Sequence, residues 1–177
     1  RAPQRSREAT HAPGRRPCPA AAMRSPPKKS KITSRISATD YHLAMSMQTT
    51  RLGRTGLTVS RLALGTMTFG LQTDEPTSFR ILDKAAEGGI NFIDTADAYG
   101  DGESERIVGA AIAARRRHWI LATKAGNVLT RRPHDGGLSR RWLLAACDDS
   151  LGRLGLDHVD IYYLHRDDPG TPLAETV

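Results

Sequence analysis

Cysteine and long apolar runs are both scarce in this sequence of 177 residues. Its two cysteines, Cys18 and Cys147, cannot build the disulfide framework of a small secreted protein. No run of about 18 apolar residues occurs, so we expect neither a membrane-spanning helix nor a membrane partner. His118 and His134 belong to no cluster with metal-ligand spacing, and we predict no metal site. Hydrophobic residues make up 38% and charged residues 25%, which excludes a collagen, a fibrous repeat and a wholly disordered chain.

Acidic residues are almost missing from residues 1–46, where ten Lys and Arg residues accompany only Glu8 and Asp40. This segment is rich in Pro, Ala, Ser and Arg, and it cannot bury enough apolar area to offset its ordering entropy. We therefore predict a disordered basic extension. Three interpretations stay open: a solvated or spurious extension upstream of a start at Met45 or Met47, a transit peptide, or a basic arm that contacts phosphate or anionic lipid. The expected location is the cytoplasm, or an organelle if the extension is a transit peptide.

The charge balance is different over residues 47–177, which hold 16 basic and 17 acidic side chains. The formal net charge of +7 therefore belongs to the extension. It gives no reason to expect nucleic-acid binding by the rest of the chain, and we predict no nucleic-acid partner.

Patterning over 47–177 predicts a β-hairpin at 49–60, followed by alternating strands and helices. Strands are expected at 62–66, 90–94, 119–124 and 159–165. Helices are expected between Asp74 and Gly88, from Ser104 to about Arg116, after Ser139, and from Pro172. Strict alternation implies parallel strands with right-handed crossovers. An open doubly wound sheet and a (β/α)8 barrel both fit this order. The dinucleotide-binding Gly-x-Gly-x-x-Gly is absent after the first strand, which disfavours the doubly wound sheet.

Three polar side chains close the predicted strands, namely Asp94, Lys124 and His165, and Tyr99 follows Asp94 by five residues. Strand ends converge on one rim in parallel α/β folds, and active sites are built there. A tyrosine with its ordinary pKa of about 10 is a poor acid near neutrality, but a nearby ammonium group favours the phenolate. We expect Lys124 to supply that charge, Asp94 to hold the lysine, and His165 to donate to a substrate oxygen. Such a set polarises a carbonyl and delivers a proton, while a cofactor supplies hydride.

Each of these residues has a plainer interpretation when it is taken alone. Asp94 could cap a helix or occupy a turn, and Tyr99 could simply pack. Lys124 could be a solvated residue at a strand end or a Schiff-base lysine. His165 could be a hydrogen-bonded histidine of the rim. Only the joint pattern of the four residues favours a proton-transfer site.

Four motifs in order resemble the aldo-keto reductase family. They are Phe92-Ile93-Asp94-Thr95-Ala96-Asp97-Ala98-Tyr99-Gly100 with Ser104-Glu105 and Val108-Gly109; Leu121-Ala122-Thr123-Lys124; Ser150-Leu151-Gly152-Arg153-Leu154-Gly155-Leu156-Asp157; and Val159-Asp160-Ile161-Tyr162-Tyr163-Leu164-His165. The stretch from His165 to Pro172 also looks like bacterial-type members. The resemblance covers about 47–177.

This resemblance implies NADPH-dependent reduction of a small aldehyde or ketone in a (β/α)8 TIM barrel. Tyr99 matches the proton donor, Lys124 and Asp94 its activating pair, and His165 the substrate-orienting residue. The resemblance places Asp94 and the loop Gly65-Thr66-Met67 beside the nicotinamide. The hairpin matches the family's plug across the N-terminal mouth of the barrel.

The predicted strands supply only the first four βα units of a barrel that typically needs about 250 residues. We therefore expect residues 47–177 to be the N-terminal half of the barrel, and the chain to be a fragment that is inactive alone. Two hypotheses remain. The first is an incomplete record of an active carbonyl reductase. The second is a non-catalytic half-barrel or redox-sensing subunit, which assembles with another copy or with a complementing chain.

Overall fold

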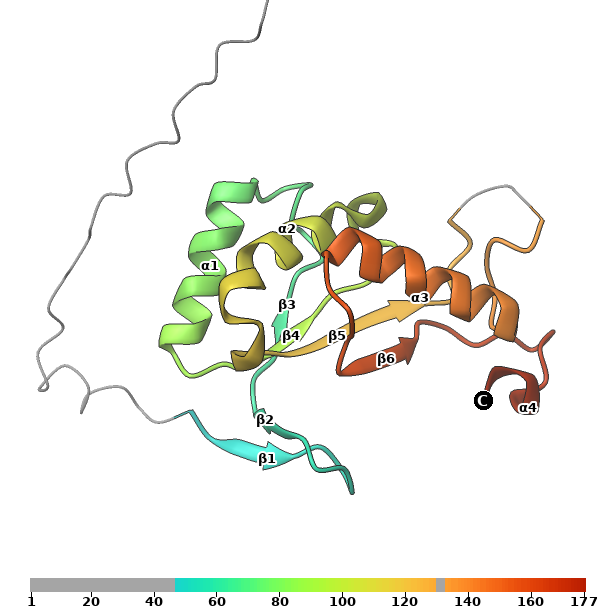
Figure 1. Ribbon diagram of the computed structural model, residues 1–177, viewed down its shortest axis with the longest axis horizontal. Helices are drawn as coiled ribbons and strands as arrows, with labels where there is room; N and C mark the ends of the chain where they lie inside the picture. Colours follow the sequence, from blue (N-terminus) through green and yellow to red (C-terminus); the bar gives the residue numbers. More distant parts are fainter. Residues whose placement is uncertain (1–46, 130–132) are drawn as a thin grey trace, which may run out of the picture. The chain divides into compact units, whose positions relative to one another are not determined.

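The computed structural model describes residues 47–129 and 133–177 (Figure 1). The basic extension predicted over 1–46 lies outside the described residues. Within the described ranges no helix is both long enough and apolar enough to cross a membrane.

An antiparallel hairpin precedes the main sheet. β1 (Thr49–Arg51) pairs with β2 (Thr58–Ser60), and Thr50 lies opposite Val59. The backbone N–H of Ser60 donates to Asn91 Oδ1 at 2.7 Å, and Asn91 Nδ2 donates to the carbonyl oxygen of Thr58 at 3.1 Å. These hydrogen bonds of Asn91 join the hairpin to the residue directly before Phe92, where the second strand of the main sheet begins.

Four parallel strands form the main sheet, in the order β3-β4-β5-β6. They are β3 (Leu64–Gly65), β4 (Phe92–Asp94), β5 (Ile120–Ala125) and β6 (Ile161–Leu164). Every neighbouring pair is parallel, which confirms the predicted α/β class with a parallel sheet. The predicted strand at 62–66 is reduced to two residues, since only Leu64 and Gly65 pair with β4.

The first helix begins and ends where its capping residues predict. Helix α1 (Glu75–Glu87) starts after Asp74, whose Oδ1 accepts from the backbone N–H of Thr77 at 2.9 Å. Pro76 occupies the first turn, where a missing N–H costs nothing. Gly88 follows the last turn, and its N–H donates to the carbonyl oxygen of Lys84 at 2.9 Å.

The second helix is shorter than its periodicity predicts. A 3₁₀ turn, η2 (Tyr99–Gly102), leads into α2 (Glu103–Ile112), and a second 3₁₀ segment, η3 (Ala113–His118), follows. Arg115 leaves the helical region with φ −143°. Arg116 bonds to the carbonyl oxygen of Trp119 at 2.7 Å and to Asp160 at 2.7 Å, so its side chain turns toward the next strands.

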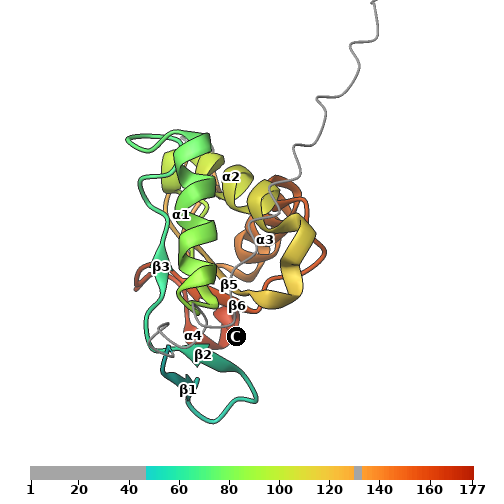
Figure 2. The same ribbon diagram turned by 90° about the vertical axis from the view of Figure 1, so that its left-hand side faces the viewer.

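The third helix completes the layer over the sheet. Ser139 caps α3 (Arg140–Leu154) by accepting from the N–H of Trp142 at 3.2 Å, and Gly155 ends it with φ +64°. The short α4 (Leu173–Thr176) follows β6. Helices α1, α2 and α3 lie side by side over one face of the sheet in both views (Figures 1 and 2).

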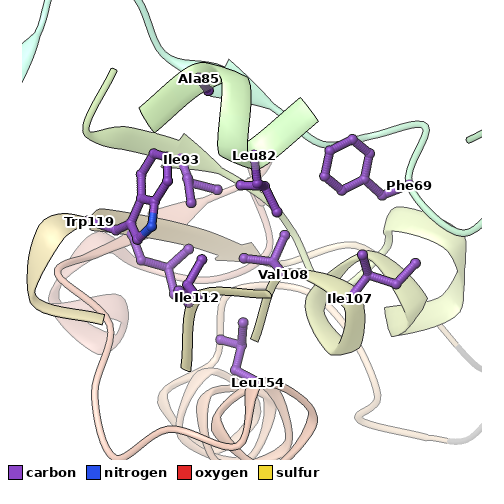
Figure 3. Close-up of a cluster of buried hydrophobic side chains, with 10 residues drawn as sticks. Phe69, Leu82, Ala85, Ile93, Ile107, Val108, Ile112, Trp119 and Leu154 are labelled. Atoms are coloured by element: carbon purple, nitrogen blue, oxygen red, sulfur yellow. The ribbon is translucent and has the colours of Figure 1, made fainter. Parts of the chain in front are cut away.

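The main core lies between these helices and the sheet (Figure 3). Its buried side chains come from α1, α2, α3, the strands and the loops between them. They are Phe69, Leu82, Ala85, Ile93, Ile107, Val108, Ile112, Trp119, Leu121 and Leu154. Gly109 brings α2 and α3 into close approach, because a Cβ at this position would lie 2.0 Å from the carbonyl oxygen of Leu154. The absence of a side chain at Gly109 therefore allows the backbone of α3 to approach α2 closely.

Candidate active site

The structure brings the four candidate residues together at the carboxyl ends of adjacent strands. Asp94 ends β4, Lys124 is the penultimate residue of β5, and His165 directly follows β6. Tyr99 reaches the same place because it opens η2 shortly after β4. The parallel sheet explains this convergence, since its strands all end at the same edge. Asp94 pairs with Ala122, two residues before Lys124, and Lys124 pairs with Tyr163, two residues before His165.

Lys124 is the centre of the arrangement. Its Nζ donates to Asp94 Oδ2 at 2.7 Å, to the carbonyl oxygen of Thr95 at 2.9 Å and to Tyr99 Oη at 2.9 Å. The side chain of Lys124 is 13% exposed and that of Asp94 is 29% exposed. The ion pair is thus only partly screened by water, which strengthens the field that the ammonium group exerts on the tyrosine oxygen.

His165 lies beside the tyrosine. The rings of Tyr99 and His165 meet edge to face, with 5.8 Å between centroids and 82° between planes. Burial and the nearby Lys124 ammonium lower the pKa of His165 from its ordinary 6.5, although Asp94 opposes the shift. The imidazole is therefore neutral near pH 7 and carries one ring proton.

The segment Gly65-Thr66-Met67, at the end of β3, presents mainly backbone atoms to the candidate site. Gly65 is exposed, and no heavy atom beyond its two chain neighbours lies within 4 Å of where its Cβ would be. Met67 is 61% exposed. Thr66, which the sequence placed among the cofactor-binding residues, is fully buried, and its hydroxyl contacts Ser104 Oγ at 2.8 Å and Asp94 O at 3.2 Å. Its side chain therefore supports the rim from beneath and does not face an open site.

A second polar cluster lies behind the site. The Glu105 side chain is fully buried and accepts from Thr123 Oγ1 at 2.5 Å and from Arg153 Nε at 2.6 Å. Thr123 immediately precedes Lys124 on β5, so this ion pair joins α2, α3 and the strand that carries the lysine. Asp97 is 1% exposed nearby, and desolvation together with the Glu105 charge raises its pKa from 3.8 to about 6.

Replacing Asp97 by asparagine should stabilise the protein in a pH-dependent way. Because the folded-state pKa is raised, the folded protein binds more protons here than the unfolded chain between pH 3.8 and about 6, and the contribution of Asp97 to stability falls as the pH rises through that window. The gain from Asp97→Asn should therefore grow by about 2 kcal/mol between pH 4 and pH 7. Urea unfolding at both pH values measures it. A gain that does not change with pH would contradict the raised pKa.

Sequence reasoning missed two contributors to this region. Glu105 lies within the first of the four motifs, but local spacing indicates no role for it, because its burial depends on an arginine 48 positions away. Asn127, which follows β5, contacts His165 Nδ1 through Nδ2 at 3.0 Å. Its place just after a strand end, three residues beyond Lys124, is the signal that could have identified it. No group of three or more His, Cys, Asp and Glu side chains suited to a metal occurs among the described residues.

A tyrosine, a lysine, an aspartate and a histidine meet at the strand ends of a parallel sheet, and this combination of side chains is chemically suited to proton transfer. Comparison with known proteins gives the family. The model of the aldo/keto reductase family matches residues 61–177, and the chain belongs to that family.

Relatives and a solved structure agree with this assignment. Uncharacterized oxidoreductase YrpG of Bacillus subtilis is 45% identical over 141 residues, which are 73% of this chain and 43% of that protein. A protein of Arabidopsis thaliana named as a probable voltage-gated potassium channel subunit beta is 41% identical over 74% of this chain and 41% of its own length. An aldo-keto reductase from Bacillus halodurans, solved in its holo form, matches with TM-score 0.66 and 41% identity, over 73% of this chain and 44% of that one. The chain thus spans about two fifths of the length of the curated relatives it matches.

Proposed function

We propose that this chain carries the proton-transfer site of an enzyme that reduces a small aldehyde or ketone to an alcohol with NADPH. The observation that carries the proposal is the position of Lys124 Nζ, which lies 2.7 Å from Asp94 Oδ2 and 2.9 Å from Tyr99 Oη. The proposal includes a (β/α)8 barrel, to which residues 47–177 contribute the N-terminal half.

Tyr99 is the proton donor in this proposal. As the substrate oxygen gains negative charge, it takes the hydroxyl proton of Tyr99 and leaves the charge on the phenol oxygen. The Lys124 ammonium, already in hydrogen-bond contact with that oxygen, stabilises the phenolate without any movement. Asp94 neutralises and orients the ammonium, so that one of its protons stays directed at the tyrosine.

His165 orients the carbonyl. Its ring lies beside that of Tyr99, and its neutral state leaves one N–H able to donate to a carbonyl oxygen. Two donors from different strand ends, the phenol and the imidazole, would then meet the same oxygen. This positions the carbonyl carbon and increases its electrophilic character.

The rim next to Asp94 fits a nicotinamide ring. Gly65 presents bare backbone with open space above it, and Met67 offers an exposed apolar side chain. The carboxylate of Asp94 has a further oxygen, Oδ1, beyond the one that Lys124 contacts. NADPH, when bound there, supplies the hydride. Thr66 holds the loop in place through Asp94 O and Ser104 and does not contact the cofactor with its hydroxyl.

The test is a reduction assay with the whole protein that contains this chain. We expect NADPH oxidation with a panel of aldehydes and ketones, and deuterium transfer from deuterated NADPH to the carbonyl carbon of the product. Binding of NADPH without oxidation by any carbonyl in the panel would contradict the catalytic proposal.

That contrary outcome would favour a second candidate, a regulatory subunit of a larger complex. Relatives from Oryza sativa and Arabidopsis thaliana, 40% and 41% identical, are named as probable voltage-gated potassium channel beta subunits. The complete set of Asp94, Tyr99, Lys124 and His165 in contact favours the enzyme, because a purely structural subunit has no need of it.

A further inference from the structure

We propose that Asn127 is a positioning residue that selects the tautomer of His165. Nδ2 of Asn127 lies 3.0 Å from Nδ1 of His165. Because an amide nitrogen can only donate, this contact keeps Nδ1 unprotonated and places the ring proton on Nε2. The inference deepens the proposed function, because the nitrogen that carries the proton is the one able to donate to a carbonyl oxygen.

The backbone holds both residues at this contact. The N–H of His165 donates to the carbonyl oxygen of Ala125 at 2.8 Å, which continues the pairing of β5 and β6. The N–H of Gly137 donates to the carbonyl oxygen of Gly126 at 3.2 Å and holds the chain immediately before Asn127. The imidazole and the amide are therefore presented to each other from two anchored segments.

Gly126 makes this turn feasible. Its φ of +121° is a backbone conformation that residues other than glycine rarely adopt. A Cβ at this position would also lie 2.9 Å from Leu138 Cδ2. The strand can consequently end at Ala125 and turn at once, so that Asn127 comes back over the end of β6. The turn at Gly126 therefore allows the Asn127 amide to come close to the His165 ring.

The surroundings of His165 make the tautomer matter. Among the residues that the structure describes, the charged and titratable groups that act on the ring or pack against it are Lys124, Asp94 and Tyr99. Burial and Lys124 keep the imidazole neutral, and a neutral imidazole has a single N–H to offer. If that proton were on Nδ1, the ring would present only a lone pair through Nε2 to a carbonyl oxygen, and the contact would be repulsive.

Nitrogen-15 NMR of the imidazole in the whole protein tests the inference directly, because it distinguishes protonated from bare ring nitrogens. In the unaltered protein above the His165 titration midpoint, we expect a protonated Nε2 and a bare Nδ1. Asn127→Asp is the decisive variant, since a carboxylate of the same shape only accepts and should draw the proton to Nδ1. Its spectra are recorded above its own midpoint, where the ring is again neutral. Val128→Thr, a change of similar size at the next position, should leave the tautomer unchanged.

Two results would overturn the inference: a protonated Nδ1 in the unaltered protein, or an unchanged tautomer in Asn127→Asp. The NMR readout does not depend on turnover, so failure of the proposed reductase activity and failure of this inference are separate results. Where the protein does reduce carbonyls, Asn127→Asp should lower kcat by about 10²- to 10³-fold, the range for loss of one hydrogen-bond donor to a developing oxyanion. Binding of NADPH should stay unchanged.

Discussion

Replacing Tyr99 by phenylalanine should lower kcat/KM for carbonyl reduction by about 10²- to 10⁴-fold, which is the range for loss of a positioned general acid. The change removes one oxygen atom and keeps the ring that packs against His165. Lys124 keeps its bonds to Asp94 and to the carbonyl oxygen of Thr95. The dissociation constant for NADPH should therefore stay nearly constant, while steady-state kinetics report the loss of the chemical step.

A second tyrosine provides the matched control. Tyr162 Oη donates to the carbonyl oxygen of Leu143 at 2.9 Å, which lies toward α3 and away from Lys124. Tyr162→Phe should cost about 1 kcal/mol of stability through the lost hydrogen bond and leave kcat/KM unchanged. Equal turnover in Tyr99→Phe and the unaltered protein would refute the role of Tyr99 as proton donor.

Replacing Glu105 by alanine should destabilise the protein by about 3–5 kcal/mol, the cost of removing one partner from a buried ion pair. The Glu105 side chain has no exposed surface, and that of Arg153 is 18% exposed. Without the carboxylate, the guanidinium loses its charge partner and Thr123 Oγ1 loses its acceptor. Urea unfolding at pH 7 measures the loss.

Glu103→Ala is the control on the same helix. Glu103 pairs with Arg106 at 3.7 Å, with both side chains about half exposed, so its loss should change stability by less than about 0.5 kcal/mol. In the double variant Glu105→Leu with Arg153→Met, apolar groups replace both charges, and much of the lost stability should return. If Glu105→Ala lowered the free energy of unfolding by less than about 1 kcal/mol, the buried pair of Glu105 and Arg153 would not be a major contributor to stability.

Local signals in the sequence were sufficient for much of the fold. Asp74 and Gly88 bound α1 because caps act through neighbouring backbone atoms, which the sequence displays directly. The polar residues at strand ends marked the site because a parallel sheet places all such ends on one edge. The roles assigned to Asp94, Tyr99, Lys124 and His165 stay predictions until the kinetic tests are made.

Features set by distant contacts could not be predicted in the same way. The spacing of Leu143, Cys147, Leu151 and Leu154, which is four, four and three residues, predicts one apolar face for the third helix. In the structure the side chains of Cys147 and Leu151 are only partly buried. The buried residues are Trp142, Leu143, Ala146, Ser150 and Leu154. The orientation of α3 follows from the close approach at Gly109 and from the bond between Arg153 and Glu105, neither of which hydrophobic spacing can reveal.

The three hydrogen bonds of Lys124 also affect how readily an aldehyde substrate would react covalently with this lysine. Aldehydes condense with amines, and the attack requires a nitrogen lone pair. An ammonium group has three protons, and at Lys124 each of them points to an acceptor: Asp94 Oδ2, the carbonyl oxygen of Thr95, and Tyr99 Oη. Deprotonation of the ammonium group would break one of these hydrogen bonds, and water could hardly replace it because the Lys124 side chain is only 13% exposed. The amine nearest the proposed reaction is thereby protected from covalent adduction, whereas the Lys84 amine, on a side chain that is 81% exposed, pairs with Glu87 in contact with solvent.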